Sequence, residues 1–335
     1  MLKEEEKFEF VINHESDIPK YQQLVDGITN AIAENILQKG DLLPSVNVIC
    51  KTYQLSRDTV FKAYSILKDQ KVIDSVPNKG YYVAGETRKV LLVLDTFKAY
   101  KEVLYHSVVN NLPDNVIVDV QFHHYNIDVF KTIINNGIGK YYKYVVMNFD
   151  NAAIAPALSA ISNDKLLLID WNIQAKKNSN YIFQDFGKAF YDALTEAADL
   201  FKKYKKIEFV YPDFTNHPWE TVEFFKKFCT DFGFKYSIIT DPKKFSIEKE
   251  IAYISVSDRI LGHFLEQCKE KDFEPGKDVG FLSYNETPMK KFIYKGISVV
   301  STDFKEIGTK TAAFITHDEE TQCYVPTKLI LRESL

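Results

Sequence analysis

Apolar positions recur at helical spacing near the start of the chain. From Tyr21 to Leu37 they follow one another at steps of three and four residues, as on one face of an amphipathic helix. Pro19 precedes this run and Gly40 follows it, and both residue types mark helix ends. The pattern predicts a helix that begins after Pro19 and stops at Gly40.

Two further helices are predicted directly after it. One is signalled by Pro44-Ser45 and runs to about Tyr53, and the next starts at Ser56, a good N-cap residue, and ends at Asp69. Only Gln54-Leu55 separates them, which forces a tight helix-turn-helix.

Two short strands are predicted next, at residues 72–76 and 81–83, around a turn that contains Pro77 and Gly80. Three helices and a hairpin make a winged helix. We therefore expect a winged helix-turn-helix domain over residues 1–84, joined by a short polar linker at residues 85–89 to the rest of the chain.

The periodicity changes after the linker, where short aliphatic strands alternate with helix-length segments. The expected strands are 90–95, 116–122, 144–149, 166–170, 207–211, 236–239, 251–255 and 279–283, and the expected helices include 154–161, 186–203, 221–231 and 260–271. Such alternation predicts an α/β fold of parallel sheets covered by helices on both faces. About 245 residues exceed one ordinary sheet, so we expect residues 90–335 to form two lobes with a crevice between them.

Length and composition narrow the class of protein. The chain has 335 residues, of which 45% are hydrophobic and 26% charged, as in a folded protein with a real core. No apolar stretch of signal-peptide length follows Met1, and the longest aliphatic runs are strand-sized, so we expect a cytoplasmic protein without a membrane partner. Four scattered cysteines form no CxxC pair, which argues against disulfides and a thiolate zinc site. No metal or cofactor is expected.

Charge is unevenly distributed in the first domain. The net charge is −4, which argues against general attraction to nucleic acid. Residues 1–38 hold three lysines and eight acids, whereas residues 39–84 hold six lysines and Arg57 against four aspartates. A modest positive segment therefore follows an acidic leader, although chance variation along a surface also produces swings of this size.

Five pieces of the first domain occur in an order and at a spacing that resemble the DNA-binding domain of GntR-family regulators. They are Pro19-x-Tyr21, Gly40-Asp41-x-Leu43-Pro44-Ser45, Leu55-Ser56-Arg57-Asp58-Thr59-Val60, Ala63-Tyr64-x-x-Leu67 and Lys79-Gly80-Tyr81-Tyr82-Val83. A helix that opens with hydroxyls, a guanidinium and free backbone N–H groups carries what binds phosphates and reads guanine edges in the major groove.

The resemblance implies particular DNA contacts. Serines at the helix starts anchor phosphates, Arg57 and its two neighbours lie over base edges, and the wing tip reaches the DNA backbone and minor groove. The expected contacts are Ser45, Asn47, Ser56, Arg57, Asp58, Thr59, Lys62, Lys79 and Gly80. Arginine is common in the family at the positions of Asn47 and Phe61. The alternatives for this region are a surface ion pair between Arg57 and Asp58 or Asp69, and for Phe61 either a thymine methyl contact or a place in the core.

The remainder of the chain resembles the effector domain of LacI-type repressors and also periplasmic sugar-binding proteins. The resemblance is best in three C-terminal segments, Val256 to Arg259, Glu274 to Asn285 and Ile297 to Gly308, with weaker matches at Val90 to Asp95, Leu167 to Asp170 and Gln184-Asp185. In that fold the ligand lies between the lobes at the carboxyl ends of the strands.

Sugar sites need carboxylates and amides for neighbouring hydroxyls, and an aromatic face for the C–H side of the ring. The strand ends offer both, and the position of Asn285 is usually a ligand-contacting aspartate in the LacI-type family. The expected ligand contacts are Asp95, Tyr100, Asp170, Trp171, Asp185, Trp219, Glu220, Asp258, Arg259, Asn285 and Phe304, with Phe97, Phe186 and His217 at the same strand ends. For each acid the alternative is a helix cap or turn residue, and for each aromatic a core position.

Other constellations carry no chemistry. His123-His124 would point to opposite faces of a strand, so a surface or core histidine is favoured over a metal pair. Gly137-Ile138-Gly139-Lys140 satisfies neither the dinucleotide nor the phosphate-loop pattern and indicates a helix end. GxSxG and HExxH are absent, so we expect no enzyme.

The sequence thus predicts a transcriptional repressor whose partners are double-stranded operator DNA and a small effector, a monosaccharide or related polyol. A homodimer is expected, because one module makes too few base contacts for genomic specificity. Effector binding would shift the population of lobe arrangements and thereby operator affinity. The alternatives are a catalytic α/β domain fused to the DNA reader, and a constitutive dimeric DNA-binding protein without an effector.

Overall fold

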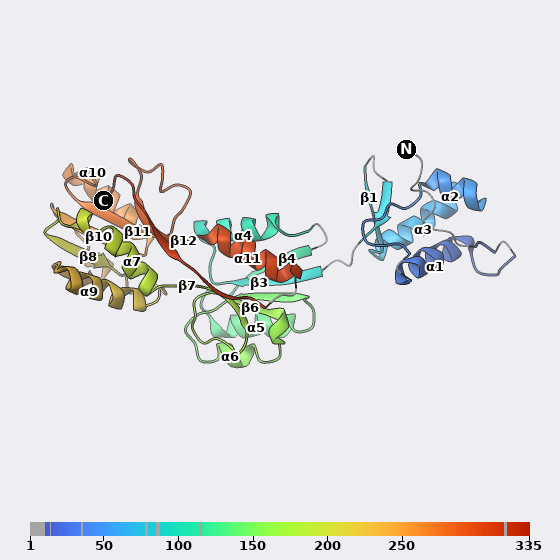
Figure 1. The fold of residues 1–335 in the computed structure, drawn as a ribbon, viewed down its shortest axis with the longest axis horizontal. Helices are drawn as coiled ribbons and strands as arrows, with labels where there is room; N and C mark the ends of the chain where they lie inside the picture. The colour runs from blue at the N-terminus through green and yellow to red at the C-terminus, as the bar shows by residue number, and fades with distance from the viewer. Residues whose placement is uncertain are drawn as a thin grey trace. The chain divides into compact units, whose positions relative to one another are not determined.

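The computed structural model describes residues 11–13, 15–34, 36–77, 80–84, 88–113, 116–317 and 320–335. The chain divides into two compact units, Met1–Lys89 with Pro113–Ile117, and Val90–Leu112 with Val118–Leu335. Each unit is described by itself (Figure 1). Lys79 and residues 85–87 of the expected linker lie outside the described residues, and Arg88 and Lys89, also expected there, begin a strand.

Three helices and a hairpin form the first unit. They are α1 (Lys20–Ala33), α2 (Val46–Tyr53), α3 (Arg57–Asp69), β1 (Ile73–Val76) and β2 (Gly80–Val83). The first helix is shorter than its apolar pattern predicted: it ends at Ala33, and the N–H groups of Ile36 and Leu37 both bond to the carbonyl of Ala31, which turns the chain. Leu37 is buried all the same, so its apolar spacing reflects the core and not the helix.

The ends of α2 and α3 follow from local capping. Ser45 Oγ accepts from the Val48 N–H at 3.4 Å, and Ser56 Oγ accepts from the Thr59 N–H at 3.1 Å. A serine at this position satisfies one of the backbone donors that a helix start leaves free. Both starts therefore lie where the sequence predicted them.

The hairpin is antiparallel and closes on the segment before α2. Ile73 pairs with Val83 and Val76 with Gly80. Leu42 makes an isolated bridge to Tyr82, and the Gly40 N–H bonds to the Val83 carbonyl at 3.0 Å. The segment around Leu42 thus lies alongside β2, at the edge of the hairpin.

The second unit contains two six-stranded sheets. The strands of the first lobe are β3 (Arg88–Leu94), β4 (Val116–Phe122), β5 (Lys143–Met147), β6 (Leu166–Asp170), β7 (Asn180–Gln184) and β13 (Gln322–Val325), in the order β13-β7-β6-β5-β3-β4. Helices α4 (Ala99–Asn110) and α11 (Phe304–His317) cover one face of this sheet, and α5 (Ile127–Gly137) and α6 (Ile154–Ala157) cover the other (Figure 1).

The second lobe repeats this plan. Its strands are β8 (Lys206–Val210), β9 (Tyr236–Ile239), β10 (Ile251–Ser255), β11 (Gly280–Tyr284), β12 (Ser298–Thr302) and β14 (Thr327–Ile330), in the order β14-β12-β11-β10-β8-β9. Its helices are α7 (Lys188–Glu196), α8 (Ala198–Phe201), α9 (Glu220–Phe232) and α10 (Asp258–Lys271). Helices α7 and α9 pack in one core and α10 in another, so both faces are covered.

The predicted α/β architecture is therefore confirmed, with differences in detail. Four strands, β7, β12, β13 and β14, were not among the expected ones. The expected helix at 186–203 is two helices, α7 and α8, and the one at 154–161 ends at Ala157. Both parallel sheets gain an outer strand from the C-terminal segment, where β13 pairs parallel to β7 and β14 pairs antiparallel to β12.

The chain crosses between the lobes three times, after β7, after β12 and between β13 and β14. Side chains tie these crossings together. The hydroxyls of Thr302 and Thr327 are 2.8 Å apart, and Thr327 Oγ1 also donates to the Asp185 carbonyl at 3.2 Å. The three connections thus form one joint.

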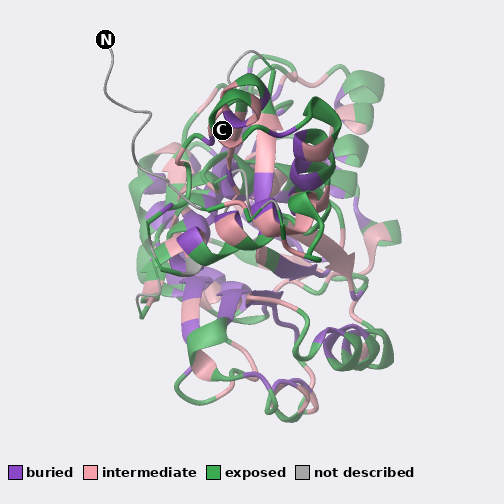
Figure 2. Ribbon diagram, turned by 90° about the vertical axis from the view of Figure 1, so that its right-hand side faces the viewer, coloured by how far each residue is buried: buried purple, intermediate pink, exposed green. Residues whose placement is uncertain are grey.

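The inner strands of both sheets are buried, whereas the outer strands β4, β9, β13 and β14 are more exposed (Figure 2). Cys229 and Cys268 are buried, Cys50 and Cys323 are half-buried, and all four are free thiols. Within the described residues, no helix combines the length and apolar character needed to cross a membrane.

Candidate functional site

The exposed N-terminal end of α3 gathers polar groups. Arg57 and Asp58 are exposed, and Thr59 is half-buried with its hydroxyl 2.8 Å from Ser56 Oγ. Within the described part of the chain, no ion pair involves Arg57, so the expected alternative of a pair with Asp58 or Asp69 is not seen. The guanidinium is available to an external partner.

The other expected DNA contacts lie around this helix end. Ser45 and Asn47 are exposed at the start of α2. Lys62 is exposed on α3, with its ammonium 3.8 Å from the centre of the Tyr21 ring. Gly80 opens β2 at φ +99°, a left-handed conformation that other residue types rarely adopt.

The second unit contains a cavity of about 430 Å³ between its lobes. Its walls come from the carboxyl ends of β3, β5 and β6 in one lobe and from the segments after β8, β10 and β11 in the other. In each sheet the strand order reverses at this edge, between β3 and β5 and between β8 and β10. Open α/β sheets bind ligands at such switch points, and here two of them face one cavity.

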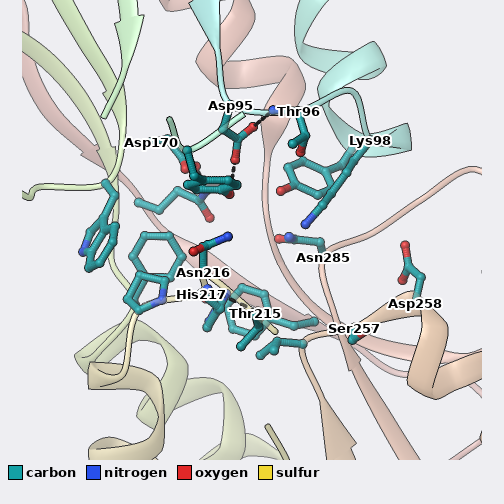
Figure 3. Close-up of a pocket in the computed structure, with 18 of the residues that line it drawn as sticks. Asp95, Thr96, Lys98, Asp170, Thr215, Asn216, His217, Ser257, Asp258 and Asn285 are labelled. Carbon is teal, nitrogen blue, oxygen red and sulfur yellow. Dashed lines mark hydrogen bonds between the residues drawn. The ribbon is translucent and has the colours of Figure 1, made fainter. Parts of the chain in front are cut away.

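Seven of the expected ligand contacts line the cavity: Asp95, Tyr100, Asp170, Trp171, Asp258, Arg259 and Asn285. Figure 3 shows Asp95, Thr96, Lys98 and Asp170 on one side and Thr215, Asn216, His217 and Ser257 on the other. The strand ends that the sequence singled out thus converge on one space.

A buried ion pair anchors the wall from the first lobe. Asp95 is 3% exposed, pairs with the buried ammonium of Lys101 and accepts a hydrogen bond from the Tyr125 hydroxyl. Burial lowers the pKa of Lys101 to about 8, against the opposing charge of Asp170. The wall is therefore held by charges that have little contact with water.

Asp170 is the second carboxylate of this wall. It lies at the end of β6 with φ +81°, an unusual conformation for aspartate, and its Oδ1 accepts from Gln184 Nε2. Enclosure between the lobes raises its pKa, which the nearby charge of Lys101 partly opposes. The backbone strain turns a carboxylate of reduced acidity toward the cavity.

Several buried oxygens of the cavity have no hydrogen-bond donor among the described residues. They are Thr96 Oγ1, Asn148 Oδ1, Gln184 Oε1 and Asn285 Oδ1. The amide nitrogens of Asn148 and Gln184 are used, by the Ile173 carbonyl at 2.9 Å and by Asp170. Because buried polar atoms are nearly always paired, these acceptors suit a ligand rich in O–H donors.

Aromatic rings also line the cavity. Phe186 contacts Trp171 with ring centres 6.5 Å apart, and His217 lies 4.5 Å from the ring of Tyr284. Burial lowers the pKa of His217 to about 3, and its Nε2 is 2.9 Å from Thr221 Oγ1. The imidazole is therefore neutral, and these rings present flat faces without charge.

A buried lysine positions the rim from the second lobe. Lys290 is 1% exposed, and its ammonium bonds to the Asn285 carbonyl at 2.7 Å and to Asp258 Oδ1 at 2.7 Å. Arg259 stacks its guanidinium 4.7 Å from the centre of the Phe214 ring. Asn285 adopts φ +63°, so its placement depends on this support.

Four expected ligand contacts do not line this cavity. Asp185 accepts from the Gly187 and Ala189 N–H groups and so caps α7. With Glu220 it lines a neighbouring, more open cavity of about 350 Å³. Trp219 packs on the Tyr211 ring, and Phe304 packs on the cavity residue Tyr100 with ring centres 4.6 Å apart. For Asp185 and Phe304 the structure corresponds to the capping and packing alternatives.

Other lining residues were not expected as contacts: Thr96, Lys98, Tyr125, Asn148, Gln184, Phe214, Thr215, Asn216, Pro218, Val256, Ser257 and Tyr284. Tyr284 lies in the segment Glu274 to Asn285, which resembles the LacI-type family, so this resemblance could have identified it. Asn148 lies inside the expected strand at 144–149, and Tyr125 follows the expected strand at 116–122, so neither was singled out as a contact.

The remaining motifs behave as core and helix-end elements. His123 is buried and stacks on Phe149 with ring centres 4.6 Å apart, as favoured over a metal pair. Helix α5 ends at Gly137, in agreement with the reading of that segment. No cluster of three or more histidine, cysteine or acidic side chains suits a metal ion in the described ranges.

Residues 20–83 match the family model described as bacterial regulatory proteins, gntR family. The first unit is a GntR-family helix-turn-helix domain.

Curated relatives match only part of the chain. The HTH-type transcriptional regulator YcxD of Bacillus subtilis (strain 168) is 36% identical over 70 residues, which are 21% of this chain and 16% of that protein. The HTH-type transcriptional regulator YdcR of Escherichia coli (strain K12) is 41% identical over 71 residues, 21% of this chain and 15% of that protein. The match thus spans about one sixth of the length of these relatives.

Solved structures match the other unit. The trehalose repressor from Escherichia coli has a TM-score of 0.62 at 14% identity, over 72% of this chain and 100% of its own. A LacI family transcriptional regulator from Lactobacillus casei with bound sucrose has a TM-score of 0.62 at 10% identity, over 74% and 99%. Behind the GntR domain, the chain therefore has the fold of LacI-type effector domains.

Proposed function

We propose that this chain is a DNA-binding transcriptional regulator, acting in the cytoplasm as a repressor, whose operator affinity is set by a monosaccharide or related polyol bound between the lobes. One observation carries the proposal. A cavity lined both by unpaired buried oxygens and by aromatic rings lies in the same chain as a GntR domain.

DNA binding is supported by the chemistry of the α3 end. Arg57 is exposed and free of ion pairs within the described residues, and guanidinium groups read guanine edges in the major groove. Exposed hydroxyls at Ser45 and Ser56 stand at two helix N-termini, where phosphates bind. The expected wing contact at Lys79 and Gly80 belongs to the same proposal.

The cavity supports a polyol over a strongly charged or purely apolar ligand. Hydroxyls can donate to Asn148 Oδ1 and Gln184 Oε1, which have no donor among the described residues, and to the Asp170 carboxylate, which can accept further hydrogen bonds. Trp171 and Phe186 offer faces for the C–H side of a sugar ring. Proteins of the same fold include the trehalose repressor and a regulator with bound sucrose.

Coupling between ligand and DNA requires a second copy of the chain. A symmetric homodimer would place two α3 helices on an inverted repeat, and a change in lobe arrangement would alter their spacing. The ligand shifts DNA affinity only by its differential affinity for the two arrangements.

The convergent polar groups of the cavity argue against a constitutive DNA-binding protein without an effector, because a purely structural core would not leave such acceptors unpaired. The LacI-type fold of the second unit likewise argues against the alternative of a catalytic α/β domain fused to the DNA reader.

The test is a thermal-shift screen of the full chain with glucose, ribose, sucrose, trehalose and myo-inositol, followed by duplex binding with and without each hit. At a ligand concentration 100 times the Kd, binding stabilises by about 2.7 kcal/mol, a rise of several degrees in Tm. Asp170→Asn should abolish the shift, whereas the surface control Asp192→Asn should retain it.

Absence of any shift across the panel would reject the ligand class. A hit that leaves duplex affinity unchanged would reject the coupling, and chemical turnover of a hit would favour the enzyme alternative.

A further inference from the structure

Helix α3 exposes a large apolar side chain on an otherwise polar surface. Phe61 is 47% exposed, one helical turn after the exposed Arg57. Its exposed neighbours on the helix are Asp58, Lys62 and Ser65. The opposite face of α3 supplies the core of the domain through Val60, Ala63, Tyr64 and Leu67.

Phe61 does not serve that core. It stands outside the cluster of buried and partly buried apolar side chains that holds the first unit together. The core reading that the sequence left open is therefore not the one observed. Burial of a half-exposed phenylalanine against a partner lowers the free energy of the complex. The chemistry of the residues around Phe61 indicates what that partner is.

The partner is the groove that Arg57 would enter. The major groove carries one apolar group at the base edges, the 5-methyl group of thymine, and phenylalanine is among the side chains that contact it. Phe61 is four residues after Arg57, so the two side chains share a face of α3. One helical turn rises about 5.4 Å, between one and two base-pair steps of about 3.4 Å.

We infer that Phe61 reads the methyl group of a thymine within two base pairs of the guanine contacted by Arg57. The inference rests on the proposed DNA-binding function and deepens it. It makes Phe61 a specificity-determining residue, and it assigns a thymine to each half-site of the operator.

The experiment first selects a duplex from a random-sequence library with the full chain. Each thymine of the selected half-site is then replaced in turn by deoxyuridine, which removes only the methyl group, and affinity is measured by fluorescence anisotropy. At one position the substitution should weaken binding about fourfold, the effect of one buried methyl-sized group. Phe61→Ala should bind the thymine and deoxyuridine duplexes equally.

Two further variants separate a direct contact from a structural effect. Phe61→Leu keeps an apolar side chain and should retain part of the discrimination. Phe292→Ala removes a ring that is even more exposed, at 70%, from the second unit and should retain all of the discrimination.

A selected duplex in which no deoxyuridine substitution weakens binding would overturn the inference alone. Equal loss by the wild-type chain and Phe61→Ala would also overturn it, since another group would then contact the methyl. Failure to select any duplex would overturn the proposed function together with the inference.

Discussion

The two candidate binding surfaces of this protein are built in opposite ways. The end of α3 is a short continuous segment whose binding groups are exposed and whose backbone needs are met by Ser56. The cavity takes its residues from strand ends of both sheets, spread over nearly two hundred positions, and its polar atoms are buried and in part unpaired. The exposed binding groups of α3 contribute little to the stability of their unit, whereas the buried polar groups of the cavity contribute to the stability of theirs.

This difference predicts how each surface responds to mutation. Exposed groups away from a cap or core contribute little to the free energy of unfolding. Buried polar groups contribute more, because removing one partner leaves the other unpaired. Substitution of Arg57 at the α3 end should therefore change binding without changing Tm, while substitutions around the cavity should change both.

The largest effect is expected for Arg57→Ala. Loss of a bidentate contact to guanine costs about 2 kcal/mol in each half-site, hence about 4 kcal/mol for a dimer, or about a thousandfold in duplex affinity. A gel-shift titration measures this change, and the Tm of the variant should equal that of the wild type. Unchanged affinity would remove Arg57 from the DNA contacts, and a lowered Tm would break the comparison.

The next effect concerns pH and a buried histidine near the cavity. His123 Nε2 donates to the Met147 carbonyl at 3.1 Å, and its Nδ1 accepts from the Tyr125 N–H at 3.0 Å, so the ring is held neutral. Burial lowers its pKa from 6.5 to about 4. Because the unfolded chain binds the proton first, this contribution is full above pH 6.5 and is lost as pH falls toward 4, by about 3 kcal/mol.

Urea unfolding at pH 6.5 and 4 measures that loss. His123→Gln should lose about 3 kcal/mol less than the wild type over this range, whereas His263→Gln, at an exposed position on α10, should follow the wild type. Equal losses in all three proteins would show that His123 does not carry the acid sensitivity.

The smallest effect tests the helix pair behind the cavity. A Cβ atom at Gly308 of α11 would lie 2.5 Å from the Ser107 Cβ and 2.8 Å from the Leu104 carbonyl of α4. Gly308→Ala should destabilise by about 2 kcal/mol through overpacking. Gly262→Ala is the matched control, since Gly262 in α10 has open space around its Cβ position and should gain about 0.8 kcal/mol.

Thermal denaturation distinguishes the two glycine variants by sign. If Gly308→Ala were as stable as the wild type, α4 and α11 would not be packed as closely as the structure has them.

The sequence predicted best what is decided locally. The starts of α2 and α3 follow from Ser45 and Ser56, and the bounds of β4, β9 and β10 follow from aliphatic runs flanked by polar residues. The predicted end of α1 was wrong because Leu37, a buried residue outside the helix, continues the apolar spacing.

What the sequence could not predict depends on distant partners. Whether Asp185 faces a ligand or caps α7 depends on the Gly187 and Ala189 N–H groups, and both roles suit an acid at a strand end. Phe304 lies behind Tyr100 because α11 returns to the first lobe, a crossing that no local pattern reveals. Strand β13 is defined by its pairing with β7, more than 130 residues away in sequence.

The hydroxyls that tie the lobe crossings together also limit how the second unit can change shape. Because hydrogen bonds join Thr302, Thr327 and the Asp185 carbonyl at one place, neither sheet can slide past the other without breaking these bonds. Turning about this place costs only small backbone adjustments, as in hinged domains. A ligand that contacts both walls would therefore rotate one lobe relative to the other, and any effect of the ligand on DNA binding would depend on the angle of that rotation.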